Sequence, residues 1–173
     1  MQTPIVIRLA DKNDAAAIAA ISRQTFYETF AGQNTPENMQ QFMTEQFTEP
    51  ALMAEVGAEG NTFLAAFMEG EMVGYARLRE APNPPELGDA PALELARIYA
   101  LQQTIGRGVG KALMGQCIDL CREKGKKILW LGVWEHNLRA IGFYTHWGFK
   151  QFGSHDFVLG SDVQTDWLMK KEI

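Results

Sequence analysis

The sequence predicts an α+β fold in which helices flank a central, mixed and mostly antiparallel sheet. The expected elements follow in the order strand, helices, two strands, loop, strand, helix, strand, helix and two strands. Strands joined by short turns pair antiparallel, whereas a strand, a helix and a strand in succession form a parallel βαβ unit. A chain of 173 residues can bury its own core, so we expect a single domain over residues 1–173.

The first strand and the first helix have clear boundary signals. Ile5–Leu9 is a short apolar run typical of a strand. Asp11 has the residue type of a helix N-cap, and Asp14 follows it one turn further on. We expect the helix to run through Phe26 and to end at Gly32.

Two more helices are expected before the sheet continues. Thr35 is followed by a proline and an acidic residue, so a second helix begins there and runs to Phe47. Thr48 begins a third amphipathic piece that stops near Gly57 or Gly60. These helices are rich in aromatic and methionine side chains. Most of these should pack on the sheet, and some could line a substrate groove.

A hairpin and a long loop come next. Residues 61–68 and 72–78 are strand-like, and Glu69–Glu71 places a glycine at the turn between them. The proline-rich stretch Ala81–Pro91 is not expected to hold regular structure. It is either a rim of the functional site or an exposed connection.

The middle of the chain has the pattern of the parallel unit. Leu93–Leu101 is predicted to be a buried strand, and Val109–Lys124 a helix that Gly125 ends. Lys127–Trp134 is a second buried strand.

The last part of the chain is expected to contain one helix and one hairpin. Asn137 is the N-cap of a helix that Gly148 closes. Phe149–Leu159 and Val163–Lys171 then pair around a short turn.

Composition excludes several classes of function. The net charge of −5 and the pI near 5.2, without any basic block, argue against nucleic acid as the main partner. No apolar run approaches the roughly 20 residues of a membrane span, and Met1–Arg8 lacks a signal-peptide pattern, so we expect a cytoplasmic protein. Cys117 and Cys121 have neither disulfide nor zinc spacing and should be buried free thiols. The three histidines also lack metal-ligand spacing, so we expect no metal.

Three glycines lie within five residues between the central strand and its helix: Gly106, Gly108 and Gly110. Glycine allows backbone N–H groups to turn inward, and the start of a helix carries a partial positive charge. The stretch therefore predicts an anion site, most naturally for phosphate. The alternative is a tight strand-to-helix turn without a ligand.

Two well-known phosphate loops do not fit these residues. The Walker loop requires a glycine where Ile105 stands and a serine or threonine where Ala112 stands. The dinucleotide loop requires a glycine at Lys111, and no acidic residue about twenty residues further on obviously serves a ribose. A third kind of loop is therefore needed.

The remaining pattern, Gln103-x-x-Gly106-x-Gly108 followed by Gly110, resembles the pyrophosphate loop of the GNAT superfamily of acyl-CoA-dependent N-acetyltransferases. Asn137 and Tyr144 resemble that family's second motif, in which an asparagine contacts pantetheine and a tyrosine approaches the sulfur. They are seven residues apart and so lie on nearly the same helix face. The resemblance implies a GNAT-like sheet whose parallel strands, 93–101 and 127–134, splay apart around the pantetheine.

The same resemblance implies acetyl-CoA as the cosubstrate and assigns residues to it. Exposed backbone on the central strand would bind the pantetheine, the glycine loop would bind the pyrophosphate, and the later helix would complete the site. These residues are Ile98, Tyr99, Ala100, Leu101, Gln103, Gly106, Arg107, Gly108, Val109, Gly110, Lys111, Asn137 and Tyr144.

Acetyl transfer from a thioester to an amine requires a stabilised oxyanion, a proton for the leaving thiolate and a neutral nucleophile. Tyr144 is expected to donate the proton. An ammonium group with a pKa of about 10.4 is almost fully charged at pH 7, so a base or a desolvating site must help to remove its proton. Glu94 and Glu135 are the candidate bases, directly or through water. A solvated or ion-paired surface role is the alternative for each.

Further segments resemble the bacterial spermine/spermidine N-acetyltransferases of the PaiA type: Trp130–Glu135, Gly153–Phe157, Gln164–Met169, Glu28–Phe30 and Gln33–Asn38. The resemblance implies a small primary amine as substrate, preferably a polyamine. A polyamine needs carboxylates around its groove. We expect Tyr27, Glu28 and Glu37 on the substrate side, and Glu135 could add a further carboxylate.

Two rival functions remain open. One is a protein N-terminal or lysine acetyltransferase on the same fold, and the other is a CoA-binding regulatory module without turnover. The sequence also leaves open the physiological amine, the base and the oligomeric state. An exposed final strand or an aromatic helix face could make a homodimer.

Overall fold

Seven strands form one sheet in the computed structural model, which describes residues 3–173 and leaves Met1 and Gln2 of the amino-terminal stretch outside the description. The strand order is β1-β2-β3-β4-β5-β7-β6. The strands are β1 (Ile5–Leu9), β2 (Asn61–Met68), β3 (Glu71–Arg79), β4 (Ala92–Ala100), β5 (Ile128–Trp134), β6 (Lys150–Leu159) and β7 (Asp162–Glu172). Only β4 and β5 run parallel among these strands, and every other neighbouring pair is antiparallel.

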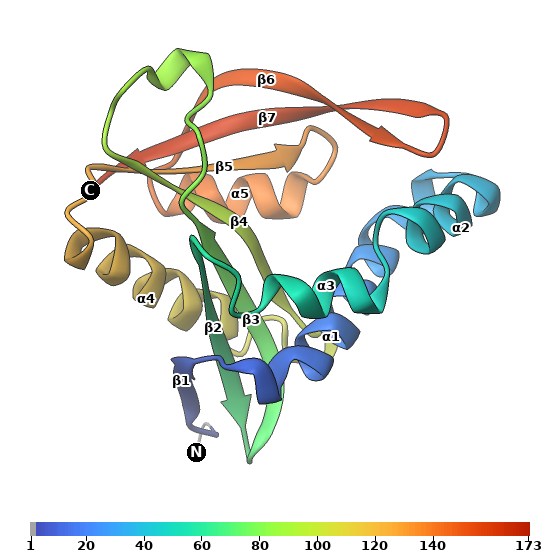
Figure 1. Cartoon of the computed structure of the whole chain (residues 1–173), viewed down its shortest axis with the longest axis horizontal. Coiled ribbons are helices and arrows are strands. Elements are labelled where there is room, and N and C mark those ends of the chain that lie inside the picture. Colours follow the sequence, from blue (N-terminus) through green and yellow to red (C-terminus); the bar gives the residue numbers. More distant parts are fainter. Residues whose placement is uncertain (1–2) are drawn as a thin grey trace.

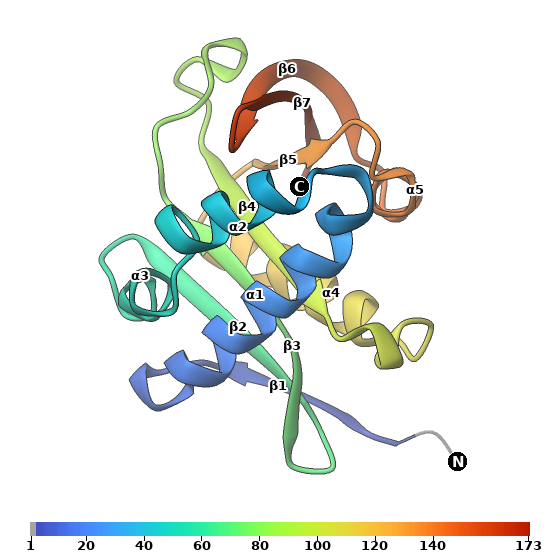
Figure 2. The same ribbon diagram turned by 90° about the vertical axis from the view of Figure 1, so that its right-hand side faces the viewer.

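Helices cover both faces of this sheet (Figures 1 and 2). They are α1 (Ala15–Phe30), α2 (Pro36–Glu45), α3 (Glu49–Glu55), α4 (Val109–Glu123) and α5 (Leu138–His146). The first three lie on one face, whereas α4 lies on the other and shares a hydrophobic cluster with α5. The predicted mixed and mostly antiparallel α+β sheet with one parallel pair is confirmed.

The central strands are apolar on both faces. Successive side chains of a strand point to opposite sides, so each strand contributes to two clusters. Leu64 and Leu78 pack with Leu113 of α4 on one side. Phe63 and Tyr75 pack with α1 on the other. This double burial explains why the strand sequences are almost continuously apolar.

The parallel strands β4 and β5 pair over only part of their length. Residues 92–94 pair with residues 128–130. Beyond them, β4 continues to Ala100 paired only with β3, and residues 131–134 of β5 pair only with β7. Figure 1 shows the two strands diverging. The splay expected from the sequence is therefore present, and it leaves one edge of β4 free of a neighbouring strand.

A β-bulge lies where the two strands separate. Arg77 pairs with Arg97, but the next residue of β3, Leu78, pairs with Leu95. Ala96 is thus the extra residue on β4. A bulge bends its own strand and increases its local twist. The bulge at Ala96 therefore turns β4 away from β5 and opens the gap.

Two boundary expectations are wrong. Gly32 does not end the first helix, because α1 stops at Phe30 and tightens into a 3-10 turn over Ala31–Gln33 without a left-handed glycine. The loop Ala81–Pro91 is not free of regular structure, because Pro85–Leu87 forms a 3-10 turn.

The loop Ala81–Pro91 is held in place by one buried side chain and by the hydrogen bonds of another. Leu87 is buried beside Trp130 and Leu168. In addition, the side-chain amide of Asn83 donates to the carbonyls of Gly88 and Ala90 at 2.9 and 2.7 Å. The loop is therefore a fixed connection on the outside of the sheet.

Asp14 joins the first strand to the first helix. Its carboxylate accepts two 2.8 Å hydrogen bonds from Arg8 of β1 and a 2.9 Å bond from the backbone N–H of Asp11. The Asp11 side chain caps the turn in return by accepting from the N–H of Asn13. The bonds from Arg8 lower the pKa of Asp14 below its ordinary value, and its own burial opposes this only partly.

We expect Asp14→Asn to lower the free energy of unfolding at pH 7 by about 1–2 kcal/mol, the usual cost of losing a cap and a charged hydrogen-bond partner. Because the folded-state pKa is depressed, the contribution is present above the unfolded-state pKa of about 3.9 and disappears as the pH falls through the folded-state value. Urea unfolding at pH 7 and at pH 3 measures the loss of stability and its dependence on pH. Asp89→Asn, at an exposed position, is the control. An equal loss at the two pH values would contradict this account.

Candidate active site

The gap between β4 and β5 opens into a cleft of about 1180 Å³. Its lining comes from the end of β4, the glycine loop and the first turn of α4 on one side. The end of β5, the start of α5, and parts of α1, β6 and β7 complete it. It is larger than a typical small-molecule pocket, so it has room for two ligands that meet.

The glycine loop gives this cleft an open helix N-terminus. Gly106 and Gly108 have φ values of +82° and +91°, which disfavour any side chain. No side chain caps the N-terminus of α4 at Gly108, whereas Thr35, Thr48 and Asn137 cap α2, α3 and α5. The first N–H groups of α4 are therefore available to an anion.

Close packing brings the start of α4 against the later part of α5. A Cβ at Gly110 would lie 3.5 Å from the ring of Phe143 on α5. Lys111 and Arg139, in the first turns of the two helices, both line the cleft and have exposed side chains. The cleft lining thus combines two cations with the free backbone donors of α4, and such groups are suited to bind phosphate.

The opposite face of the gap, toward α1, has a different character. The ring of Trp134 lies 4.9 Å from that of Phe30, so this end of β5 faces α1. Asp166 is the cross-strand partner of Trp134 and therefore points to the same face. Further rings line the cleft from the same side, namely Phe26, Phe42, Phe47 and Phe157. The carboxylates that line the cleft are those of Glu28 and Asp166 among the described residues.

Tyr144 of α5 lines the cleft from the face of α4. Only 9% of the residue is exposed, and its ring lies 5.6 and 5.8 Å from those of Phe143 and Phe149. Burial raises the pKa of its hydroxyl well above the ordinary value, with a smaller contribution from Cys117. The hydroxyl therefore stays protonated at neutral pH. Asn137 lines the same cleft, and its side chain caps α5 by accepting from the N–H of Ala140 at 3.3 Å.

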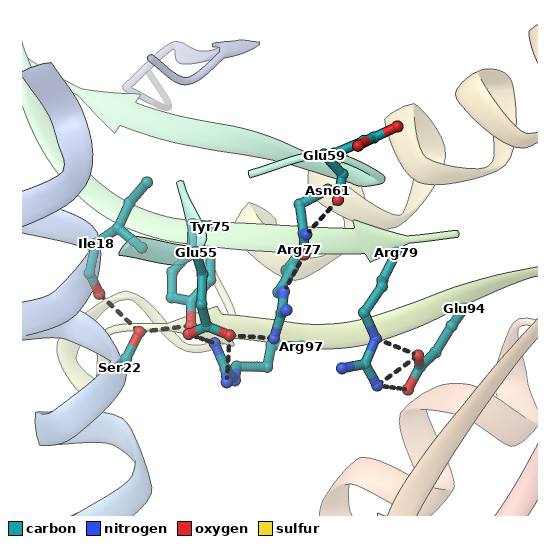
Figure 3. A network of polar contacts seen from close by, with 10 residues as sticks. All are labelled: Ile18, Ser22, Glu55, Glu59, Asn61, Tyr75, Arg77, Arg79, Glu94 and Arg97. Atoms are coloured by element: carbon teal, nitrogen blue, oxygen red, sulfur yellow. Dashed lines mark hydrogen bonds and ion pairs between the residues drawn. The ribbon is translucent and has the colours of Figure 1, made fainter. Parts of the chain in front are cut away.

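Both glutamates considered as bases lie outside the lining of the cleft. Glu94 accepts two hydrogen bonds from Arg79, at 2.7 and 2.9 Å (Figure 3). It sits at the last position where β4 still pairs with β5, before the gap opens. Glu135 is partly exposed and lies 3.4 Å from His136. The structure thus pairs Glu94 with Arg79, leaves Glu135 partly exposed, and brings neither residue to the cleft.

A second polar network supports the floor of the cleft (Figure 3). Both carboxylate oxygens of Glu55 on α3 accept from Arg97 of β4, at 3.0 and 3.1 Å. The neighbouring Arg77 of β3 also pairs with Glu55. Tyr75 and Ser22 share a hydrogen bond beside this group. The network binds α1 and α3 to the part of the sheet from which β4 diverges.

Most of the expected cofactor residues do line the cleft. They are Ile98, Tyr99, Ala100, Gly106, Gly108, Val109, Gly110, Lys111, Asn137 and Tyr144. Leu101, Gln103 and Arg107 do not, and the Arg107 guanidinium instead donates to Thr3 at 3.4 Å. Of the expected substrate residues Glu28 lines the cleft, whereas the exposed Tyr27 and Glu37 do not.

Sequence reasoning missed several lining residues. Arg139 could have been found, because it stands in the first turn of a helix already assigned to the site. Asp166 could not, because only the pairing of β7 with β5 carries it there. No residue of Ala81–Pro91 lines the cleft, so that loop is a connection and not a rim.

Comparison with known proteins identifies the family. A family model described as "Acetyltransferase (GNAT) family" matches residues 20–149. The chain belongs to this family. An uncharacterized N-acetyltransferase of Lactobacillus delbrueckii subsp. lactis is 39% identical over 168 residues, which cover 97% of this chain and 96% of that protein.

A sequence match and a structure match, both from Thermoplasma acidophilum, extend the comparison. A spermidine N(1)-acetyltransferase is 25% identical over 84% of this chain and 88% of that protein. The crystal structure of a PaiA N-acetyltransferase in complex with coenzyme A has a TM-score of 0.78 at 23% identity, covering 98% of this chain and 99% of that one. At this identity the structural similarity concerns the fold.

GNAT N-acetyltransferases use acetyl-CoA, and the cleft fits this cosubstrate. The free edge of β4 offers backbone groups to an amide-containing arm, and the glycine loop offers donors and cations to a pyrophosphate. Residues 3–173 contain no group of three or more His, Cys, Asp or Glu side chains placed to hold a metal ion. Across that same range, no helix is long and apolar enough to cross a membrane.

We expect Gly108→Ala to lower the free energy of unfolding by about 1–2 kcal/mol, because alanine is strained at a φ of +91°. The displaced loop should also bind coenzyme A about tenfold more weakly. Gly115→Ala is the matched control, since it lies within α4 with nothing within 4 Å of an added Cβ and should be stabilising by about 0.5–1 kcal/mol. Urea unfolding measures the stability of the two variants, and calorimetric titration measures their affinity for coenzyme A. Unchanged coenzyme A affinity in Gly108→Ala would contradict a role of the glycine loop in binding coenzyme A.

Proposed function

We propose that this acetyltransferase transfers the acetyl group of acetyl-CoA to a primary amine of a polyamine such as spermidine or spermine. The observation that carries the proposal is the separation of charge within one cleft. Lys111 and Arg139 line the cleft from the first turns of α4 and α5, whereas Glu28 and Asp166 stand on the side of α1. The remaining arginine of the lining, Arg97, is already paired with Glu55. An anionic cosubstrate and a cationic acceptor would each meet opposite charge.

The aromatic lining also suits a polyamine. On the acceptor side, the ring of Phe30 lies 4.9 Å from that of Trp134 and 6.1 Å from that of Phe157. The methylene groups of a polyamine can pack on such rings, and its ammonium groups gain cation–π attraction over their faces. The carboxylate of Glu28, which accepts a 3.1 Å bond from Gln24, can take a distal ammonium group.

Two relatives add support for this acceptor. The Thermoplasma relative is named a spermidine N(1)-acetyltransferase. A spermine/spermidine N(1)-acetyltransferase of Bacillus subtilis is 30% identical over 92 residues, which cover 53% of this chain and 60% of that protein.

The cofactor residues have distinct proposed roles. Gly106, Gly108 and Gly110 leave the N–H groups at the start of α4 open to the pyrophosphate, and Lys111 adds charge. The backbone from Ile98 to Ala100 bonds the pantetheine arm in place of a neighbouring strand. The cosubstrate supplies an activated acetyl thioester.

Tyr144 is the proposed proton donor to the leaving sulfur. Its hydroxyl is held in an apolar surround, and its raised pKa keeps the proton in place until negative charge develops on the sulfur. The amine attacks from the side of α1, where the carboxylates and aromatic rings lie.

An amine panel tests the acceptor. With acetyl-CoA, we expect thiol release with spermidine or spermine to exceed that with a matched monoamine about tenfold or more in kcat/KM, the effect of one additional charged contact. Glu28→Gln should reduce this advantage and leave the monoamine rate unchanged, whereas Glu45→Gln, on the exposed face of α2, should affect neither substrate. Preference for an alanyl peptide over every polyamine would favour the protein acetyltransferase. No thiol release despite tight acetyl-CoA binding would favour the CoA-binding module without turnover.

A separate variant tests the acid. We expect Tyr144→Phe to lower kcat by about 100-fold or more while the affinity for coenzyme A changes little, because only the proton donor is lost. Stopped assays of thiol release and equilibrium titration of coenzyme A give the two values. Full turnover in Tyr144→Phe would exclude the hydroxyl as the acid.

A further inference from the structure

The proposed reaction leaves one proton without an acceptor. An ammonium group must lose its proton before its nitrogen can attack, and neither Glu94 nor Glu135 lines the cleft. Glu28 and Asp166 are the carboxylates that do so in the described part of the chain. The two differ, because Glu28 is exposed on α1 whereas the side chain of Asp166 is only 18% exposed.

Asp166 is placed at the open end of the gap. It pairs with Trp134 of β5 on one side and with His155 of β6 on the other. A Cβ at Gly132 would lie only 3.6 Å from its Oδ2, and Gly132 itself lines the cleft. Because Gly132 has no side chain, nothing from β5 covers the carboxylate at this point.

Asp166 and Tyr144 approach the gap from opposite faces. Tyr144 belongs to the cluster of α4 and α5, whereas Asp166 shares the α1 face with Trp134. A thioester held in the gap therefore has a proton donor on the side of its sulfur and a carboxylate on the side from which the amine comes.

The surroundings of Asp166 favour a basic carboxylate. Burial raises its pKa above the ordinary value, and His155 opposes the shift only partly. The Nε2 of His155 lies 3.4 Å from Oδ2, and 51% of the histidine side chain is exposed. From the other packed elements, β5 presents the Gly132 backbone and the ring of Trp134. The further titratable or charged groups of the lining on that side are His136, whose ring lies 5.4 Å from Trp134, Glu28 of α1 and Arg97 of β4.

We propose that Asp166 accepts the proton of the substrate ammonium and that His155 passes it on to solvent. The inference rests on the proposed acetylation of an amine. The N–H bond of the ammonium breaks and the proton moves to the carboxylate of Asp166, then to the imidazole of His155, and then to water. The freed electron pair forms the new N–C bond as the C–S bond breaks, and Tyr144 protonates the sulfur. The nitrogen loses its second proton as the amide forms, and that proton returns the Tyr144 oxygen to its hydroxyl form. One proton is released to solvent in each turnover.

A pH–rate profile tests this route. Asp166→Asn keeps the shape of the side chain but removes the proton acceptor, so kcat at pH 7 should fall by about 100-fold or more. The lost rate should return as the pH rises toward the pKa of the amine, because the nucleophile then deprotonates without help. His155→Gln should lower kcat by a smaller factor, about three- to tenfold, because Asp166 can still exchange with water less efficiently.

Asp156→Asn is the matched control. Asp156 is exposed on β6 next to His155, points to the opposite face and does not line the cleft. Its profile should match that of the wild-type protein. Thermal unfolding and coenzyme A affinity of all three variants should be unchanged, which separates a proton acceptor from a merely structural aspartate.

The outcomes separate this proposal from the proposed function. If the wild-type protein acetylates amines and Asp166→Asn retains its rate, or loses rate equally at every pH, the proton route is overturned and the acetyltransferase assignment stands. If no amine in the panel is acetylated, both the proposed function and the proton route are contradicted. A large loss at pH 7 that high pH restores supports both.

Discussion

The separation of β4 from β5 is the constraint on which the rest of the site depends. Backbone N–H and C=O groups that pair with a neighbouring strand are not available to a ligand. The pairing stops after residues 92–94 of β4, and the bulge at Ala96 directs the rest of the strand away. The glycine loop and α4 follow from this strand, so the same deviation also sets the position of the anion site.

Such a gap needs support, because nothing across it stabilises the strands. Glu55 provides it on one face by binding Arg97 and Arg77, whose adjacent positive charges would otherwise repel each other. On the other side of the gap, β5 is held by seven registered pairs with β7. The two halves of the sheet are therefore each rigid by themselves, and the cleft between them is largely preformed.

Local signals in the sequence predicted the elements well. Caps such as Thr35, Thr48 and Asn137 act on their own backbone, so their positions can be found without knowing the fold. The glycine loop was recognisable for the same reason. What escaped prediction depends on register. Glu94 meets Arg79 only through the shifted pairing of β3 and β4, and Asp166 reaches the cleft only through the pairing of β7 with β5.

The free edge of β4 has a consequence for the solubility of the protein. An unpaired strand edge at the margin of a sheet invites pairing with another chain and so promotes aggregation. Here the edge lies in the middle of the sheet, enclosed by β5 and flanked by α1 and α5. In this position the edge does not lie at a margin where another chain could extend the sheet. The fold thereby keeps the backbone groups of β4 open to a cofactor without offering an outer edge to other chains.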